Sequence, residues 1–341
     1  METLLLKPSE DNTAIRKAAE LLRQGGIVAI PTETVYGLAA NALDEGAVNR
    51  IFKAKGRPQD NPLIVHICEF DEIYPLVRKV PPAAKALAET FWPGPLTLVL
   101  PRSDKIPNNV SAGLDTVAVR MPSHPVAWAI IKESGLPLAA PSANISGFPS
   151  PTAAQHVQDD MTGRIDAIVD GGECEVGVES TVLSLTGEVP VLLRPGGVTL
   201  AQLESVLGRV EVNEAVLNPL KEGETAASPG MRHKHYAPKA EITVIKGSAS
   251  QIAEYVAAHT GNDLAVLCFE GDEHLFTLPT VTFGRENDAF SQARGLFGAL
   301  RRLDELGAKQ VFACCPSQEG VGLAVCNRLF RAAEFRIIEI R

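Results

Sequence analysis

Short apolar runs alternate with amphipathic segments along residues 1–208. The runs that predict buried strands, each rich in Val, Ile, Leu or Ala, are 27–30, 63–67, 96–100, 117–120, 138–140 and 181–185. Between several of them apolar residues recur every three or four positions, as in the helix predicted from Asp44 to about Gly56. Helices between strands indicate a partly parallel, twisted α/β sheet.

The pattern loses its periodicity over residues 209–240, where Glu, Gly, Ser and Pro accumulate as in a linker. Strand-like runs then return at 242–245, 264–268, 311–313 and 337–340, with helical periodicity over 248–259 and 289–306. We therefore predict an α/β domain over 1–208, a linker over 209–240 and a smaller Rossmann-like α/β domain over 241–341. Neither the G-x-G-x-x-G nor the P-loop nucleotide fingerprint occurs.

Composition narrows the class of protein. The net charge of −9 argues against broad adhesion to nucleic acid or to an anionic membrane. The first residues contain no basic region and an apolar run of three leucines, which predicts neither a signal peptide nor a membrane span. Six cysteines show no C-x-x-C pair and no zinc-like spacing, so we expect no metal site, reduced thiols and a cytoplasmic location.

A cationic turn follows the helix predicted to end at Gly56. Lys53, Lys55 and Arg57 fall within five residues, and Gly56 and Pro58 stiffen the turn. Favourable interaction with the helix C-terminus would explain them without any ligand. A stiff loop that presents Lys and Arg is also what an oligophosphate requires, so we expect Lys55 and Arg57 to be solvent-accessible in the unliganded site.

Other polar groups also lie at the ends of predicted strands, where open α/β sheets bind ligands. Residues 31–37 combine hydroxyls, a carboxylate and a phenol, and Arg120 leaves a buried strand in need of an anionic partner. Residues 141–152 form a turn rich in hydroxyl and amide groups, like an anion nest. His66 stands alone on a strand, where a histidine is more often a packed core residue than a ligand contact.

These motifs occur together in one known family. Residues 31–37 (PTETVYG), 142–147 (SANISG), 179–181 (EST) and 194–196 (RPG), with Lys55 and Arg57, resemble those of the YrdC-like threonylcarbamoyl-AMP synthases. Residues 228–238 (SPGMRHKHYAP) resemble the linker of their longer, two-domain form. The resemblance implies a catalytic YrdC-like twisted open α/β domain over 1–208, a linker that acts as a lid over 209–240, and a smaller C-terminal Rossmann-like domain.

The resemblance also implies an activity, that of a nucleotidyltransferase. The enzyme would make L-threonylcarbamoyl-adenylate from ATP, L-threonine and bicarbonate and release pyrophosphate, with Mg²⁺ accompanying ATP. This is the first step towards N6-threonylcarbamoyladenosine in tRNA. A downstream threonylcarbamoyl transferase would modify the tRNA, so we expect direct tRNA binding by this chain to be weak or absent.

Site residues follow from the same resemblance. The catalytic group would be Lys55, Arg57, Ser142 and Asn144. The residues expected to bind ATP are Arg57, Asn61, Thr116, Ser142, Ser150, Arg194, His235 and Tyr236, the last two from the lid. The residues expected to bind threonine are Thr34, His66, Arg120, Ala140 (through its backbone) and Ser180.

Two other functions stay open at this point. A non-catalytic RNA-binding protein could use the basic residues Arg232, Lys234 and Lys239, with Tyr236 for stacking. The 5% aromatic content and the acidic net charge argue against this RNA-binding function. A hydrogenase-maturation carbamoyltransferase contains a related domain, but such proteins also carry zinc-finger cysteine pairs, and this sequence has none.

Overall fold

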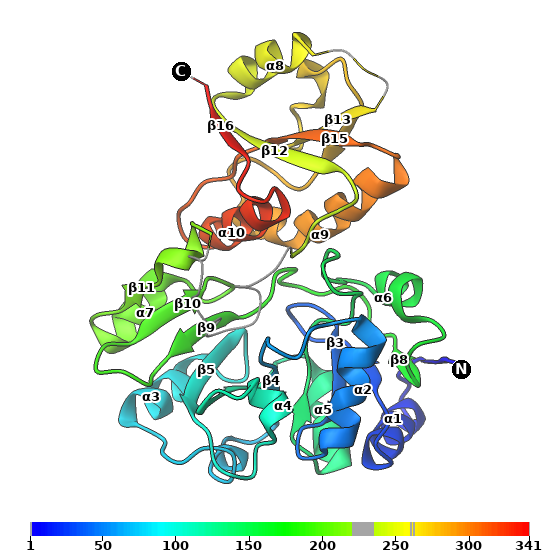
Figure 1. The fold of residues 1–341 in the computed structure, drawn as a ribbon, viewed down its shortest axis with the longest axis vertical. Coiled ribbons are helices and arrows are strands. Elements are labelled where there is room, and N and C mark those ends of the chain that lie inside the picture. Colours follow the sequence, from blue (N-terminus) through cyan, green and yellow to red (C-terminus); the bar gives the residue numbers. More distant parts are fainter. Residues whose placement is uncertain (1, 220–234, 260, 262, 341) are drawn as a thin grey trace.

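The computed structural model describes residues 2–219, 235–259, 261 and 263–340. Two lobes lie one above the other, each built around its own sheet (Figure 1). The predicted linker motif falls partly on residues 228–234, which lie outside the described residues, whereas residues 235–240 are described. Within the described ranges, no helix has the length and apolar character needed to cross a membrane.

The N-terminal lobe contains a mixed sheet, as the sequence predicts. Its described strands follow the order β1-β8-β2-β3-β7-β4-β6-β5-β9-β10-β11. Parallel pairs such as β4 with β6 occur beside antiparallel pairs such as β2 with β3. The strands are β1 (Leu4–Leu6), β2 (Val28–Ile30), β3 (Gly37–Asn41), β4 (Ile64–His66), β5 (Leu96–Pro101), β6 (Thr116–Arg120), β7 (Leu138–Ala139), β8 (Ala167–Val169), β9 (Thr181–Ser184), β10 (Val191–Arg194) and β11 (Glu211–Val212).

Helices cover both faces of this sheet. Along β2, Val28 and Ile30 pack in one buried cluster, and Ala29 packs in another, because successive strand side chains point to opposite faces. Helix α1 contributes to the first cluster and α2 to the second. The described helices of this lobe are α1 (Thr13–Arg23), α2 (Glu45–Lys55), α3 (Pro82–Phe91), α4 (Asn108–Ser111), α5 (Pro125–Ser134), α6 (Ala154–Met161) and α7 (Leu200–Leu207), with 3₁₀ turns η1 (Phe70–Ile73) and η2 (Glu214–Val216).

Local signals fix both ends of α2, the helix that carries the cationic turn. The Asp44 side chain accepts hydrogen bonds from the backbone N–H groups of Gly46 and Ala47, which caps the N-terminus. Gly56 ends the helix with φ of 60°, a left-handed conformation that favours glycine. The helix therefore ends where the sequence predicts, with Lys55 in its last turn and Arg57 just beyond it.

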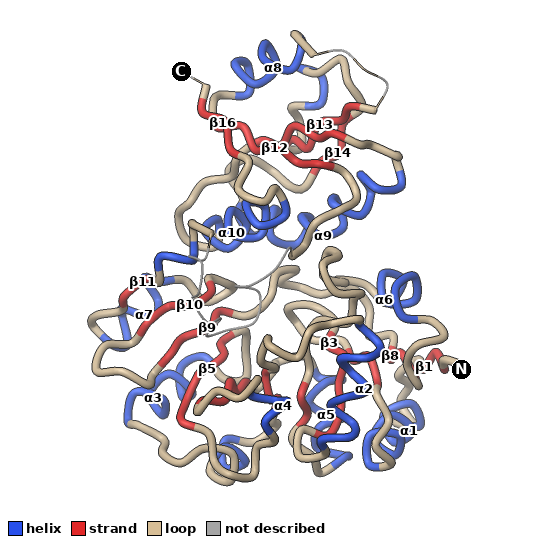
Figure 2. Tube along the Cα trace, viewed as in Figure 1, coloured by secondary structure: helices blue, strands red, loops and turns tan. Residues whose placement is uncertain are grey.

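The C-terminal lobe is a smaller α/β domain with a parallel sheet, which confirms the Rossmann-like prediction. Its described strands follow the order β14-β13-β15-β12-β16. Helices α9 and α10 lie between this sheet and the N-terminal lobe, and α8 lies on the far side (Figures 1 and 2). The elements are β12 (Glu241–Lys246), α8 (Ala249–Ala257), β13 (Leu264–Cys268), η3 (Glu273–Leu275), β14 (Thr280–Thr282), α9 (Ala289–Glu305), β15 (Gln310–Cys314), α10 (Gly322–Ala332) and β16 (Ile337–Glu339).

Some elements are absent from the sequence-based prediction. Strand β3 was not predicted because Gly37–Asn41 contains no β-branched residue and directly follows a motif that resembles a turn. The domain boundary at residue 208 stays a prediction, and β11, just beyond it, pairs with β10 as part of the larger sheet. All six cysteines are free and, apart from Cys315, buried, as expected for small core residues.

Candidate active site

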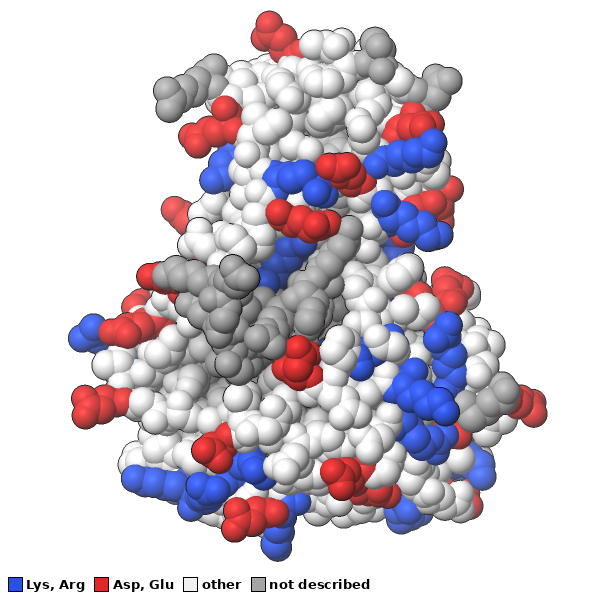
Figure 3. All heavy atoms as spheres, in the orientation of Figure 1, with Lys and Arg blue, Asp and Glu red and all other residues white. Residues whose placement is uncertain are grey.

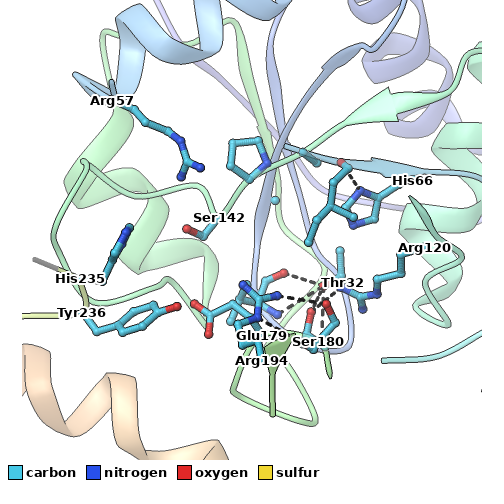
Figure 4. A pocket seen from close by; sticks show the side chains of 16 residues that line it. Thr32, Arg57, His66, Arg120, Ser142, Glu179, Ser180, Arg194, His235 and Tyr236 are labelled. Atoms are coloured by element: carbon cyan, nitrogen blue, oxygen red, sulfur yellow. Dashed lines mark hydrogen bonds between the residues drawn. The ribbon is translucent and has the colours of Figure 1, made fainter. Parts of the chain in front are cut away.

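A cavity of about 60 Å³ lies where the loops of the larger sheet meet the described end of the linker (Figure 4). Its lining comes from segments far apart in the sequence. The predicted residues that line it are Thr34, Arg57, His66, Arg120, Ala140, Ser142, Ser180, Arg194, His235 and Tyr236. The structure thus brings together all the predicted threonine-binding residues and part of the predicted ATP-binding and catalytic sets.

Five predicted residues do not line this cavity: Lys55, Asn61, Thr116, Asn144 and Ser150. Thr116 begins β6 and pairs with Pro101 on β5. Asn61 is buried and its backbone oxygen accepts a hydrogen bond from Arg57 at 3.1 Å. Any contact with substrate through these five residues stays a prediction.

The expectation that Lys55 is solvent-accessible is wrong. Its side chain is buried, and Nζ donates to the backbone oxygens of Ser142 at 2.5 Å and Asn144 at 2.6 Å. Burial, followed by the nearby Arg57 charge, lowers the pKa of Lys55 well below its ordinary value. The physical reason is that the carbonyl groups of the 142–144 turn point at the end of α2 and need a donor. Lys55 therefore holds the turn that carries Ser142.

The same turn is closed by its own side chains. Ser142 Oγ donates to Asn144 Oδ1 at 2.5 Å, and Asn144 Nδ2 donates to the backbone oxygens of Ile145 and Phe148 at 2.8 and 2.9 Å. Because Asn144 is buried and fully engaged, it fixes the Ser142 hydroxyl on the cavity wall.

Arg120 finds the anionic partner that its position requires within the protein. Its Nη2 lies 2.6 Å from Glu33 Oε1, and both side chains are 4% exposed. Its Nη1 donates to Thr34 Oγ1 at 2.8 Å. Burial alone would raise the pKa of Glu33, but the Arg120 charge lowers it, so the pair is ionised. Glu33 was not predicted as a site residue, although it stands within the 31–37 motif.

His66 is both packed and part of the cavity wall. It is buried on β4, and Nδ1 lies 3.2 Å from the backbone oxygen of Ile64. Burial, reinforced by the Arg120 charge, lowers the pKa of His66 to about 3. The imidazole is therefore neutral at physiological pH and contributes hydrogen-bonding capacity without adding charge.

Arg57 and Arg194 add positive charge to the cavity wall. Nη2 of Arg57 donates to the backbone oxygens of Asn61 and Pro62 at 3.1 and 3.2 Å. Arg194 Nε donates to the backbone oxygen of Ser180 at 3.1 Å, and Nη2 donates to Ser180 Oγ at 3.2 Å. Burial lowers the pKa of each guanidinium to about 10, so both remain cations near neutral pH.

Glu179 is a cavity residue that the site prediction missed. One carboxylate oxygen accepts from Ser150 Oγ at 2.5 Å, and the other accepts from Arg328 Nε at 2.7 Å. Its position in the motif 179–181 was the sequence signal that could have identified it as a site residue. Arg328 could not be placed from sequence, although an arginine inside the mostly apolar stretch 321–333 is an unusual core residue.

The described end of the linker forms part of the cavity wall. Tyr236 is buried, with its ring centroid 5.3 Å from that of Phe297 on α9 and 5.5 Å from that of His235. The backbone N–H of Ala237 donates to the oxygen of Gly147 at 2.9 Å, next to the turn that carries Ser142. His235 and Tyr236 thus lie against the cavity, as Figure 4 shows.

The surface charge concerns the RNA-binding alternative, and the arrangement of metal-binding side chains concerns the carbamoyltransferase alternative. On the face in Figure 3, basic and acidic side chains are interspersed over both lobes. Of the basic residues considered for RNA binding, Lys239 is exposed, and Arg232 and Lys234 lie outside the described residues. Among the residues that the structure describes, no group of three or more His, Cys, Asp or Glu side chains is arranged to hold a metal ion.

Comparisons with known proteins agree with the two-part architecture. The family model described as telomere recombination matches residues 20–196, and the one described as threonylcarbamoyl-AMP synthase, C-terminal domain, matches residues 198–334. The threonylcarbamoyl-AMP synthase of Pyrococcus abyssi is 49% identical over 335 residues, covering 96% of each chain. That of Bacillus subtilis is 47% identical over 334 residues, covering 97% of this chain and 96% of the relative.

A solved structure is similar over the whole chain. The crystal structure of P. abyssi Sua5 complexed with L-threonine superposes with a TM-score of 0.90 at 45% identity, covering 100% of both chains. Together with the two family models, this similarity extends across the catalytic lobe, the linker and the C-terminal lobe. The chain belongs to the threonylcarbamoyl-AMP synthase family, in its two-domain form.

Proposed function

We propose that this protein makes L-threonylcarbamoyl-adenylate from ATP, L-threonine and bicarbonate and releases pyrophosphate. The observation that carries the proposal is the cavity in which the cations Arg57, Arg120 and Arg194 converge beside the hydroxyls of Thr34 and Ser180. The reaction brings together negatively charged reactants, and a desolvated wall of fixed cations favours such an encounter.

Threonine would bind in the part of the cavity formed by Thr34, His66, Arg120, the backbone of Ala140, and Ser180. Arg120 would clamp the carboxylate, and Glu33 would keep the guanidinium in one orientation. Because His66 is neutral, its ring can hydrogen-bond to threonine without adding a second cation beside Arg120. The relative crystallised with L-threonine supports this choice of amino acid.

ATP would arrive as its Mg²⁺ complex, so the metal ion belongs to the substrate. Arg57, Ser142, Arg194, His235 and Tyr236 line the cavity and would contact the nucleotide. The proposed contributions of Asn61, Thr116 and Ser150 require the nucleotide to extend beyond this cavity. Lys55 and Asn144 would act on the reaction through the position of Ser142.

The proposed reaction has two steps, formation of the carbamate and its adenylylation. The neutral amine of threonine attacks the carbon of bicarbonate, water leaves, and an N-carboxylate forms. One oxygen of that carboxylate attacks the α-phosphorus of ATP, and the bond to the pyrophosphate oxygen breaks. Arg57 and Arg194 would stabilise the charge that develops on the α-phosphate and on the departing pyrophosphate. No covalent intermediate with the enzyme is required.

The lid role of the linker stays a proposal that rests on residues 235–237. The carbamate is short-lived in water, so a segment that closes the cavity would protect it. The adenylate would then pass to a threonylcarbamoyl transferase that modifies tRNA in the cytoplasm. This chain needs no direct tRNA contact for that sequence of reactions.

The test is pyrophosphate release measured with each substrate omitted in turn, with mass spectrometry of the adenylate product. Full activity should require Mg²⁺–ATP, L-threonine and bicarbonate together. An equal rate of pyrophosphate release without threonine or without bicarbonate would refute the proposed reaction. Carbamoyl phosphate as the carbamoyl donor provides the comparison with the carbamoyltransferase function.

A further inference from the structure

Arg328 of the C-terminal lobe is bound to the loops of the catalytic lobe. It stands in the middle of α10, and its side chain is fully buried. Its Nε donates to Glu179 Oε2 at 2.7 Å, and Nη2 donates to the backbone oxygen of Glu179 at 3.0 Å. Its Nη1 donates to the backbone oxygen of Pro195 at 2.9 Å. One guanidinium group therefore joins two separate loops of the other lobe.

Both loops supply walls of the cavity. Glu179 and Ser180 come from the first, and Arg194 directly precedes Pro195 in the second. The loops touch so closely that a Cβ atom added to Gly196 would stand 2.2 Å from the backbone nitrogen of Thr181. The position of the Ser180 hydroxyl thus depends on how the two loops are held against each other, and Arg328 contacts both.

Arg328 also sets the charge of the cavity wall. Glu179 lines the cavity, and burial alone would raise its pKa, but Arg328 and then Arg194 lower it, so the carboxylate is ionised. In the absence of Arg328, Arg194 and the Ser150 hydrogen bond still favour the ionised form, and the uncompensated carboxylate would repel the carboxylate of threonine and the phosphates of ATP. Arg328 offsets this charge from behind the wall, so that compensation of Glu179 does not depend on Arg194 alone.

The stability of the fold does not by itself require the buried ion pair between Arg328 and Glu179. A buried ion pair gains little over a well-packed apolar pair, because desolvation of both charges offsets their attraction. The adjacent side chains of α10 illustrate a simpler contact. Asn327 Nδ2 donates to the backbone oxygen of Val216 at 2.5 Å, and Arg331 Nη2 donates to that of Ala215 at 2.7 Å. Both contact residues 215–216, near the start of the predicted linker, and neither of these residues lines the cavity.

We infer that Arg328 is a positioning residue for the reaction, through which the C-terminal lobe fixes the 179–180 and 195–196 loops and neutralises Glu179. The inference rests on the proposed function and assigns the C-terminal lobe a part in it beyond carrying the linker. Arg328 itself lies outside the cavity lining and acts through Glu179 and Ser180.

The experiment compares three variants of the full chain with wild type: Arg328→Met, Arg328→Lys and the matched control Arg301→Met. Arg301 also joins the lobes through a buried carboxylate, Asp160, at 2.8 Å, but neither residue lines the cavity. For each protein we would measure the melting temperature, threonine binding by calorimetry, and kcat and KM from pyrophosphate release at a temperature where all variants are folded.

Arg328→Met should lower kcat/KM for threonine about tenfold or more and weaken threonine binding, because it leaves Glu179 uncompensated. Arg328→Lys keeps the charge but not the forked geometry, and it should restore part of kcat/KM. Arg301→Met should lower the melting temperature while kcat/KM stays within about twofold of wild type. A second change, Glu179→Gln in the Arg328→Met background, should recover part of the threonine affinity, since the repelling charge is removed.

A purely structural role would give a different pattern. Arg328→Met and Arg328→Lys would then melt at lower temperature yet keep wild-type kcat/KM and threonine affinity, and the inference would be overturned. If Arg328→Met does not fold, Arg328→Lys decides the question by the same two readouts. If wild type binds threonine more tightly than Arg328→Lys but releases no threonine-dependent pyrophosphate, the role of Arg328 in shaping the threonine site stands and the proposed reaction fails.

Discussion

Replacing Lys55 by Met tests whether this lysine holds the Ser142 turn or acts on the substrate. The change keeps most of the side-chain volume but removes the Nζ hydrogen bonds to the backbone oxygens of Ser142 and Asn144. Both acceptors then lose their donor in a site where Lys55 itself is 2% exposed. The variant should therefore lose stability and activity together.

The magnitude follows from these contacts. Each buried carbonyl oxygen left without a donor costs about 1–3 kcal/mol, so losing both partners would cost about 2–6 kcal/mol. Removing the buried, desolvated amino group recovers part of this, which leaves a loss of about 3 kcal/mol in the free energy of unfolding. For a domain of this size, that corresponds to a fall of about 6–12 °C in melting temperature.

The assay pairs thermal unfolding with pyrophosphate release at a temperature where the variant is folded. Lys53→Met is the matched control, because Lys53 lies on the same helical turn but is exposed. It should change the melting temperature by less than about 2 °C. If Lys55→Met melts with wild type and loses only activity, then Lys55 acts directly on the substrate and the positional reasoning is refuted.

Three further predictions concern other features of the site. Between pH 6.5 and about 3 the folded protein binds fewer protons at His66 than the unfolded chain does, so stability falls as the pH decreases through this window. In urea titrations at pH 7 and 5, His66→Asn should lose less stability between the two pH values than wild type does. An equal loss would contradict the lowered pKa of His66. Gly196→Ala should abolish threonine binding or folding because its Cβ would meet the backbone of Thr181, whereas Gly187→Ala, whose nearest atom is 3.6 Å away, should behave as wild type in calorimetry. Serine should be used with a kcat/KM about fivefold lower than threonine, because it lacks a methyl group whose burial contributes about 1 kcal/mol, and equal kcat/KM values would show that the methyl group is not buried.

Periodicity predicted β2, β4, β6, β7 and β9, which carry most of the site, because they are short, apolar and bounded by turns, but it did not predict β10, which ends at Arg194. It missed β3, whose Gly and Ala residues have low strand propensity and are held in place by β2 and β7 on either side. The resemblance to the family grouped Thr34, His66, Arg120 and Ser180 as threonine-binding residues, although nothing in their spacing along the sequence requires them to lie close together. That knowledge lies in the resemblance and not in the hydrophobic pattern.

Side-chain environment was harder to predict than location. Lys55 was expected to be exposed because it stands at a turn that could present cations to an oligophosphate, but the carbonyl groups of a turn 87 residues away provide its partners. Arg328 is separated by 149 residues from Glu179, so no local pattern could pair them. The first contact depends on packing within the N-terminal lobe and the second on packing between the lobes, and single-sequence periodicity encodes neither.

The small cavity beneath Tyr236 has a consequence for the timing of substrate entry. About 60 Å³ is far below the roughly 300–1,000 Å³ of pockets that enclose small-molecule ligands. A cavity this small encloses threonine and the part of the nucleotide that contacts it only when the wall moves, and movements of loops over active sites take microseconds to milliseconds. The observed rate of association should rise with nucleotide concentration and then reach a plateau set by that movement. In a stopped-flow experiment the plateau would measure how often the protein is open to its substrates.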